Sequence, residues 1–325
     1  MATATQPKTL QEAIKFFSVY ENCREALMAI RWPGGTVACP RCGSLNITYL
    51  ENARLWKCYE KHPKAKFSLK VGTIFEDSPI ALEKWLPALW LLTNCKNGIS
   101  SYELARALGV TQKSAWFMLS RLRLALQDSH DGGKLDGGIE VDETFIGGKA
   151  RNMHKGKRER VLQGRRGGLS GKVAVMGLLQ RHPGKGQSRV RLKIVKKTRR
   201  GDLVPHITEN VAAGANVFTD ALSSYDALYQ HGFMHDMVDH AERYAIGNVH
   251  TNGMENFWAL LKRTLGGTYI SVEPFHLFRY LDEQAFRFNN RDGNDQNRFY
   301  AALKGILGRR VTFAALTGAN QPQTC

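Results

Sequence analysis

The sequence predicts a multidomain chain with a small cysteine-containing module, an all-α region and an α/β domain built on a mixed sheet. Three observations carry this prediction. Cysteine and histidine residues lie close together between positions 39 and 62, apolar residues recur at helical spacing over residues 80–128, and short strand-like runs follow a Gly-rich stretch. The length of 325 residues suits two or three domains of ordinary size.

Composition and charge narrow the class of protein further. Hydrophobic residues make up 43% and charged residues 23% of the chain, which excludes wholesale disorder. The most apolar stretch, around residues 80–92, contains Glu83, Lys84 and Pro87, so it falls short of the roughly 20 apolar residues that a membrane span needs. A formal charge of +17 favours a polyanionic partner, and nucleic acid is the first candidate.

Six parts follow one another along the chain. Residues 1–35 read as helix, because Thr9 and Glu12 fit a capping box and Pro33 stops the run. Residues 36–75 form the cysteine module, residues 76–130 a helical region and residues 131–138 a Gly-rich linker. The α/β domain is expected over residues 139–310, with strands at 139–146, 172–180, 189–195 and 216–220, and residues 311–325 read as a C-terminal tail.

The cysteine module has the spacing of a zinc site. Cys39 and Cys42 form a CxxC knuckle, and Cys58 follows with His62 three intervening residues further on. Tetrahedral Zn²⁺ takes four nitrogen or sulfur ligands, and so small a module needs a metal to supply folding free energy. Residues 1–17 carry no secretion signal, so disulfides are not expected. Two free thiols in a turn, with the other two residues unrelated, are the alternative.

Residues 100–123 read as two helices joined by a tight turn. Gly109 permits the turn and Thr111 caps the second helix. The outward positions of the second helix are expected to be Gln112, Lys113 and Arg121, which are residue types that contact bases or phosphates in a major groove. The alternative is a helical hairpin used only for packing.

Two acids mark the expected strands. Asp142 lies within the strand 139–146, on the side that it shares with Glu140 and Thr144, and Asp220 ends the strand 216–220. An acid in an apolar strand is costly unless a divalent cation neutralises it. A surface ion pair for Asp142 and a helix cap for Asp220 are the alternatives. Glu143 points to the opposite side of its strand and is left out of the predicted site.

A third acid, Glu255, lies near the start of a helix that begins at residue 252. Three carboxylates from two strands and a helix can hold two Mg²⁺ ions, the arrangement that promotes in-line phosphoryl displacement. Lys262 follows two helical turns later on the same face, where it and Arg263 are placed to contact a DNA phosphate. Asn252 and Glu255 also fit a capping box, and Asn252 is itself an alternative third ligand. His250 borders the same region.

Together these motifs resemble those of the insertion-sequence transposases with an N-terminal zinc ribbon and a DDE catalytic domain, the ISXO-like group. The resemblance covers about residues 10–295. It rests on the CxxC knuckle, the two-helix segment, the segments 67–75, 141–148, 250–258 and 287–291, and Lys262 with Arg263. The family's ribbon commonly has a second CxxC where this chain has Cys58 and His62. The chain therefore differs from the family's pattern at the fourth zinc ligand.

The resemblance implies an RNase H-like fold for the α/β domain, dependence on Mg²⁺ or Mn²⁺, and cutting and joining of DNA at the ends of an element. It makes Asp142 and Asp220 the first two catalytic acids and Glu255, or else Asn252, the third. Lys262 is expected to assist them. The zinc ribbon, with a structural Zn²⁺, and the helix-turn-helix are expected to recognise terminal inverted repeats.

We therefore expect a DDE-type DNA transposase that acts on double-stranded DNA as a homo-oligomer, has no membrane partner and works in the bacterial cytoplasm at the nucleoid. A rival from another class is a non-catalytic DNA-binding regulator derived from such an element. A structure-selective nuclease without strand transfer is a third hypothesis. The presence of every candidate acid favours the enzyme.

Overall fold

The computed structural model describes residues 6–127, 133–148, 154–162, 171–181, 188–220, 223–225, 228–238 and 250–317. The chain forms two compact units. One contains Met1–Gln127 and Gly293–Cys325, and the other contains Asp128–Asp292. Among the described residues, no helix combines the length and the apolar character that crossing a membrane requires.

The N-terminal segment folds as two helices, α1 (Leu10–Phe17) and α2 (Tyr20–Arg31), where the sequence suggested one helical run. The predicted capping box is present at the start of α1. The Thr9 hydroxyl accepts from the Glu12 backbone N–H at 3.3 Å, and the Glu12 carboxylate accepts from the Thr9 backbone N–H at 3.3 Å. The second helix ends at Arg31, before Pro33, as expected for a proline that cannot continue a helix.

The cysteine module contains a small antiparallel sheet. Its strands are β1 (Ile47–Leu50), β2 (Leu55–Cys58) and β3 (Lys66–Phe67), paired in that order. Aromatic rings supply its apolar core, because Trp56 stacks on Phe67 with ring centroids 5.8 Å apart and lies 4.7 Å from Tyr49. So few buried side chains give the module little hydrophobic stabilisation of its own.

The helical part of the same unit comprises α3 (Leu82–Asn94), α4 (Ser101–Leu108), α5 (Gln112–Ala125), α10 (Asp295–Lys304) and α11 (Phe313–Thr317). The last two come from the far end of the chain. Phe299 of α10 is fully buried against Phe17 at 5.1 Å and Trp90 at 5.3 Å between ring centroids. Residues 293–310 were expected in the α/β domain, and the structure instead groups them with the N-terminal unit because of this core.

The predicted tail also differs from the structure within the described residues. Residues 313–317 form α11, and Leu316 is fully buried. Residues 318–325 lie outside the described part of the chain.

The second unit is built on a mixed sheet, as predicted, and the described residues give it five strands. Its strands are β4 (Gly138–Ile146), β5 (Val173–Gln180), β6 (Arg189–Val195), β7 (Asn216–Asp220) and β8 (Met234–Val238), in the order β6-β5-β4-β7-β8. The pairs β4–β5 and β5–β6 are antiparallel, whereas β4–β7 and β7–β8 are parallel. The first four strands lie where the sequence placed them, and β8 was not predicted. A short helix, α6 (Lys155–Leu162), lies between β4 and β5 in the chain.

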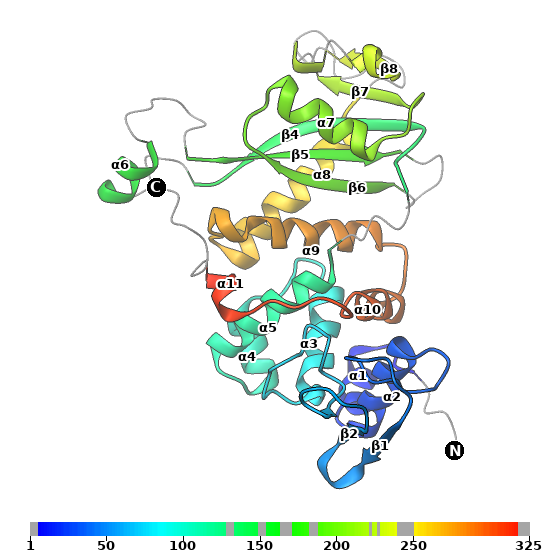
Figure 1. The fold of residues 1–325 in the computed structure, drawn as a ribbon. Helices are drawn as coiled ribbons and strands as arrows, with labels where there is room; N and C mark the ends of the chain where they lie inside the picture. The colour runs from blue at the N-terminus through cyan, green and yellow to red at the C-terminus, as the bar shows by residue number, and fades with distance from the viewer. Residues whose placement is uncertain are drawn as a thin grey trace. The chain divides into compact units, whose positions relative to one another are not determined.

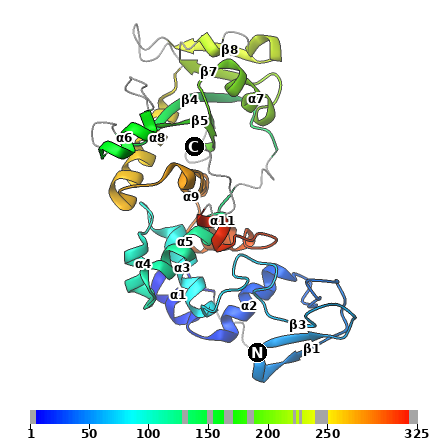
Figure 2. The ribbon, with the colours of Figure 1, turned by 60° about the vertical axis from the view of Figure 1, so that its left-hand side comes forward.

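Helices cover both faces of this sheet (Figures 1 and 2). One face packs on α7 (Arg200–Asn210) and the short 3₁₀ helices Ser223–Tyr225 and Leu228–His231, around a core that includes Ile139 and Val141. The other face packs on α8 (Asn252–Thr264) and α9 (Leu277–Asn289), around Val175 and Phe257. A π-helical turn, Leu265–Tyr269, follows α8 directly. Because side chains alternate along a strand, Glu140 and Asp142 face α8, whereas Glu143 faces α7.

Candidate metal centre and acid site

The four predicted zinc ligands converge. The thiols of Cys39, Cys42 and Cys58 and a ring nitrogen of His62 all lie within 4.8 Å of one another. The Sγ of Cys39 is 3.5 Å from Nε2 of His62, and the thiols of Cys42 and Cys58 are 3.7 Å apart. One Cys3His set of this kind is what a closed structural zinc site requires.

The surroundings of the cluster suit a metal as well. The Nδ1 of His62 lies 2.9 Å from the carbonyl oxygen of Pro63, a contact that fixes the ring and leaves Nε2 facing the thiols. Burial acts to raise the pKa of Cys39, but backbone N–H groups of Arg41 and Cys42 bond its sulfur and lower the pKa to about 7. A thiol of that pKa is readily present as the thiolate that binds zinc.

The segment predicted as two helices and a turn forms α4 and α5. Ser100 and Glu103 make a capping box at α4, Gly109 adopts the left-handed conformation that ends it, and the Thr111 hydroxyl caps α5. Gln112 is half-buried and donates to the Ser101 hydroxyl at 2.8 Å.

Of the three residues of α5 expected to face outward, only Lys113 is exposed. Arg121 is wrongly predicted as an outward residue, because only 4% of it is exposed. Its guanidinium donates to the carbonyl of Ile74 at 3.0 Å and to that of Glu76 at 2.6 Å, and it lies over the ring of Phe117. The second half of α5 is buried on all sides except at the half-buried Leu124, so this part of the helix has no exposed face. Arg121 is a packing residue.

The two strand acids lie on the same face of the sheet. The parallel register of β4 and β7 pairs Glu140 with Phe218, and two residues further along the two strands come Asp142 and Asp220. Paired residues in neighbouring strands point to the same face. Both carboxyl groups therefore belong to the α8 side, at the carboxyl end of β7.

Asp142 is held in a defined orientation. One carboxylate oxygen accepts from the backbone N–H of Glu143 at 2.8 Å, and the other accepts from the indole N–H of Trp258 at 2.9 Å. Burial raises the pKa of Asp142 to about 6 against these bonds, and the charges of Asp220 and Glu255 act in the same direction as burial. Asp142 is thus repelled by the charges of both Asp220 and Glu255, a cost that a divalent cation bound by the three acids would remove.

Glu255 lies in the first turn of α8, and its position excludes one of the alternatives. The helix begins after Thr251, whose own side chain makes no cap, and Asn252 is already the first helical residue. The capping box that would have explained Asn252 and Glu255 without a metal is therefore absent. Both side chains are exposed, as are Lys262 and Arg263 near the end of the helix.

Several polar residues around these acids were not selected from the sequence. Glu140 is buried and accepts from Arg181, which also contacts His250. Glu143 is half-buried on the other face and accepts from the hydroxyl of Tyr225. Burial, with the charges of Asp220 and Asp142, raises the pKa of Glu143 to about 8. The signal in the sequence was the run of three acids within one strand, at positions 140, 142 and 143.

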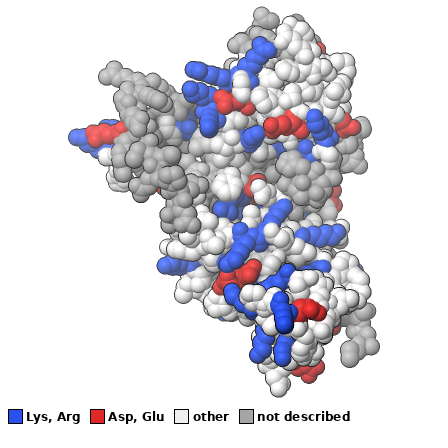
Figure 3. All heavy atoms as spheres, in the orientation of Figure 1, with Lys and Arg blue, Asp and Glu red and all other residues white. Residues whose placement is uncertain are grey.

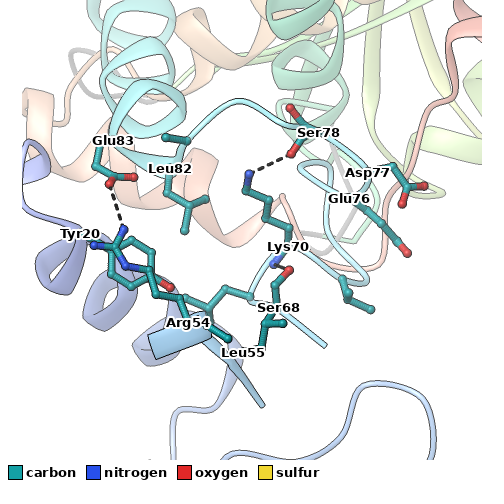
Figure 4. A pocket seen from close by; sticks show the side chains of 14 residues that line it. Tyr20, Arg54, Leu55, Ser68, Lys70, Glu76, Asp77, Ser78, Leu82 and Glu83 are labelled. Atoms are coloured by element: carbon teal, nitrogen blue, oxygen red, sulfur yellow. Dashed lines mark hydrogen bonds and ion pairs between the residues drawn. The ribbon is translucent and has the colours of Figure 1, made fainter. Parts of the chain in front are cut away.

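A separate cavity of 450 Å³ lies in the N-terminal unit, and Figure 4 shows its lining. Its cationic side chains are engaged within its own wall. The Lys70 ammonium donates to the carbonyls of Ser78 at 2.9 Å and Ile80 at 2.6 Å, and Arg54 pairs with Glu83 at 3.7 Å. None of the predicted site residues lines it among the described residues.

Comparison with known families identifies the class of protein. Residues 134–289 match the ISXO2-like transposase domain, and residues 21–60 match the transposase zinc-ribbon domain. The first match contains Asp142, Asp220 and Glu255, which we call the acid site. The chain belongs to the ISXO2-like transposases. The zinc-ribbon match includes the three cysteines and ends before His62.

Individual relatives agree with this assignment. The chain is 27% identical over 266 residues to an uncharacterized protein in transposable element ISH50 of Halobacterium salinarum, covering 78% of this chain and 85% of that protein. It is 33% identical over 115 residues to an uncharacterized transposase-like protein of Haemophilus influenzae, covering 35% of this chain and 93% of that protein. No solved structure matches the chain.

Proposed function

We propose that the chain is a DNA transposase that binds the terminal inverted repeats of an insertion sequence and catalyses metal-dependent phosphodiester hydrolysis and strand transfer. The observation that carries the proposal is that Asp142 and Asp220 lie on the same face of the sheet and that the charges of Asp220 and Glu255 both act on the Asp142 carboxyl group. The strand order, with three antiparallel strands followed by two parallel ones, supports an RNase H-like fold for residues 128–292.

The three carboxylates would hold Mg²⁺ or Mn²⁺. Oxygen ligands of this kind suit such hard cations, and the chemistry that bound ions supply is polarisation of the attacking and leaving oxygens. We favour Glu255 over Asn252 as the third ligand, because a carboxylate suits a hard divalent cation better than a neutral amide and because the Glu255 charge acts on Asp142. Trp258 orients the Asp142 carboxylate. Lys262 is exposed two turns after Glu255 and is placed to bind a DNA phosphate.

DNA recognition is assigned to the N-terminal unit. Exposed basic side chains gather over the zinc ribbon (Figure 3), namely Arg41, Lys61, Lys64 and Lys66. The exposed start of α5, with Lys113 and the half-buried Gln112, is the part that a recognition helix inserts in a groove. Phosphate contacts from these residues would position the element end, and we expect the protein to act there as a homo-oligomer.

Cleavage and binding of element-end DNA test the proposal. A DNA duplex that carries the flanking repeats is incubated with Mg²⁺ and with one of three proteins: the wild type, Asp142→Asn or Glu209→Gln. Glu209→Gln is the control, because Glu209 lies at an exposed position of α7. We expect Asp142→Asn to lose cleavage and keep end binding, and Glu209→Gln to keep both. Cleavage by Asp142→Asn at the wild-type rate would remove the acid site from the mechanism. Specific binding without cleavage by the wild-type protein would favour the non-catalytic regulator.

The zinc site makes a separate prediction. We expect about one Zn²⁺ per chain, and Cys42→Ser to lose that zinc, because three ligands hold the ion less tightly and the module has little core. Zinc content by elemental analysis and thermal unfolding measure the effect. Cys95→Ser, at the end of α3 outside the cluster, is the control and should retain zinc. A folded wild-type protein without zinc would refute the assignment.

A further inference from the structure

Glu140 is a buried acid that the acid site itself does not use. Its side chain is only 2% exposed, it lies two residues before Asp142 in β4, and it points to the same face. One of its oxygens accepts from Nε of Arg181 at 2.6 Å, and the other accepts from the backbone N–H of Met254 at 2.8 Å. The carboxylate thus joins β4 to the first turn of α8.

The cation that neutralises Glu140 is fixed as well. Arg181 directly follows β5, and its guanidinium lies 4.2 Å from the centre of the Phe218 ring in β7. Its Nη2 donates to Nδ1 of His250 at 2.8 Å and also bonds the His250 carbonyl. Arg181 therefore links the sheet to the residue that precedes the N-cap of α8.

The first turn of α8 is shaped to receive the carboxylate. A Cβ added at Gly253 would lie 2.8 Å and 3.0 Å from the two oxygens of Glu140, so only glycine allows this approach. The N-cap residue Thr251 makes no side-chain cap. Glu140 bonds an N–H group that the helix leaves without an internal partner, and its charge is favourable at the positive end of the helix dipole.

Anchoring this turn controls where Glu255 points. Glu255 is the residue after Met254, whose N–H is held by Glu140, and Trp258 one turn later is held by Asp142. Two bonds from one strand, one turn apart, fix the rotation of α8 about its axis. That rotation decides whether the exposed Glu255 carboxylate faces Asp142 and Asp220 or turns away.

We propose that Glu140 is the positioning residue of the acid site: with Arg181 it holds the start of α8 so that Glu255 completes the divalent-metal site with Asp142 and Asp220. The inference rests on the proposed function. The proposed role of Glu140 goes beyond a contribution to stability. A buried ion pair such as that of Glu140 with Arg181 is weak evidence that the pair stabilises the fold.

The test is a titration of the zinc-loaded protein with Mn²⁺, with free Mn²⁺ measured by electron paramagnetic resonance. Gly253→Ala is the sharpest variant, because alanine favours the helix but displaces the carboxylate of Glu140. Glu140→Gln removes the charge that pairs with Arg181. Gly201→Ala in α7, where an added Cβ meets no atom within 4 Å, is the matched control.

We expect Gly253→Ala and Glu140→Gln to weaken Mn²⁺ binding by about tenfold or more, the range seen when partners of metal ligands are removed. Gly201→Ala should bind as the wild-type protein does. Excess metal should restore cleavage of element ends by Gly253→Ala but not by Asp142→Asn. A purely structural role for Glu140 would not produce this recovery. If Glu140→Gln does not fold, Gly253→Ala decides the question alone.

Two results overturn the proposal, and they are distinguishable. Wild-type Mn²⁺ affinity in folded Gly253→Ala would remove the positioning role and leave the proposed function intact. Wild-type protein that binds Mn²⁺ no better than the Asp142→Asn, Asp220→Asn double variant would overturn the metal site itself, and the positioning role with it.

Discussion

Asp142 and Glu143 are neighbours in β4 but lie on opposite faces of the sheet. Asp142 faces α8 and the other two acids, with a pKa of about 6, whereas Glu143 faces α7, accepts from Tyr225 and has a pKa of about 8. At neutral pH Glu143 therefore keeps its proton and carries no charge into the site. Its hydrogen bond links β4 to the segment that follows Asp220.

Replacement of Glu143 by glutamine tests this difference through the pH dependence of stability. Between about pH 4.5 and 8 the native carboxyl keeps a proton that the unfolded chain has lost, so the free energy of unfolding falls as pH rises through this window. Glu143→Gln keeps an acceptor for Tyr225 and removes the titration. We expect its denaturation midpoint to depend less on pH than that of the wild-type protein.

Urea unfolding across the same window measures this, with Glu209→Gln at an exposed position as the control. A dependence on pH equal to that of the wild-type protein would show that Glu143 is ionised in the folded state.

Individual residues also show how far the sequence could be interpreted. The grouping of Cys39, Cys42, Cys58 and His62 and the places of Asp142 and Asp220 in their strands were predictable, because spacing and strand pattern are local features. Arg121 was misplaced and Glu140 was missed because their partners are distant in the chain. Arg121 bonds carbonyls more than 40 positions away, and Glu140 bonds Met254 at a separation of 114. No periodicity within one helix or strand reports such contacts.

At the scale of elements, the contact of α8 with the sheet depends on a missing side chain. Gly177 of β5 pairs with Asp142, and an added Cβ there would lie 2.2 Å from Cε of Met254 and 2.8 Å from the Trp258 ring. The helix can approach the sheet closely only because this position is glycine. The same approach lets the Trp258 indole reach Asp142.

We expect Gly177→Ala to lower the free energy of unfolding by about 1–3 kcal/mol, the usual cost of overpacking. End cleavage should fall as well, since Trp258 and Glu255 both move with α8. Thermal unfolding and the cleavage assay measure the two effects, with Gly201→Ala as the control. An unchanged cleavage rate together with a lowered melting temperature would contradict this prediction, because it would show that cleavage does not depend on the close packing of α8.

The predicted elements agree with the structure where their pattern is strong. The strands at 189–195 and 216–220 were placed correctly because they are apolar or alternate. In contrast, β8 was missed. It lies at the edge of the sheet, and its sequence includes His235 and Asp236 between exposed methionines. Such a strand is defined by its pairing with β7 more than by its own composition.

At the scale of the whole molecule, the chain completes its N-terminal unit with its C-terminal segment. Phe299, nearly 300 positions from the start, packs on Phe17 and Trp90. The sequence interpretation placed residues up to 310 in the α/β domain because chain order was the only guide to domain membership. Long-range packing decided otherwise.

Phe299→Ala should therefore weaken the N-terminal unit, to which we assign DNA recognition, and spare the acid site. Removal of this buried ring typically costs about 3–5 kcal/mol, so we expect reduced binding of element ends and unchanged Mn²⁺ affinity. Phe275→Ala, at a position that is 37% exposed, is the control. Loss of Mn²⁺ binding in folded Phe299→Ala would contradict the division into two units.

The most direct test of the central claim is transposition in cells. A donor plasmid carries a selectable marker between the gene's own flanking repeats, and the wild-type protein is compared with Asp220→Asn. The account predicts that the marker moves with the wild-type protein and not with Asp220→Asn. Equal movement with both would contradict the assigned acid site. Movement with neither, while repeat DNA is still bound in vitro, would contradict the enzyme and favour the DNA-binding regulator.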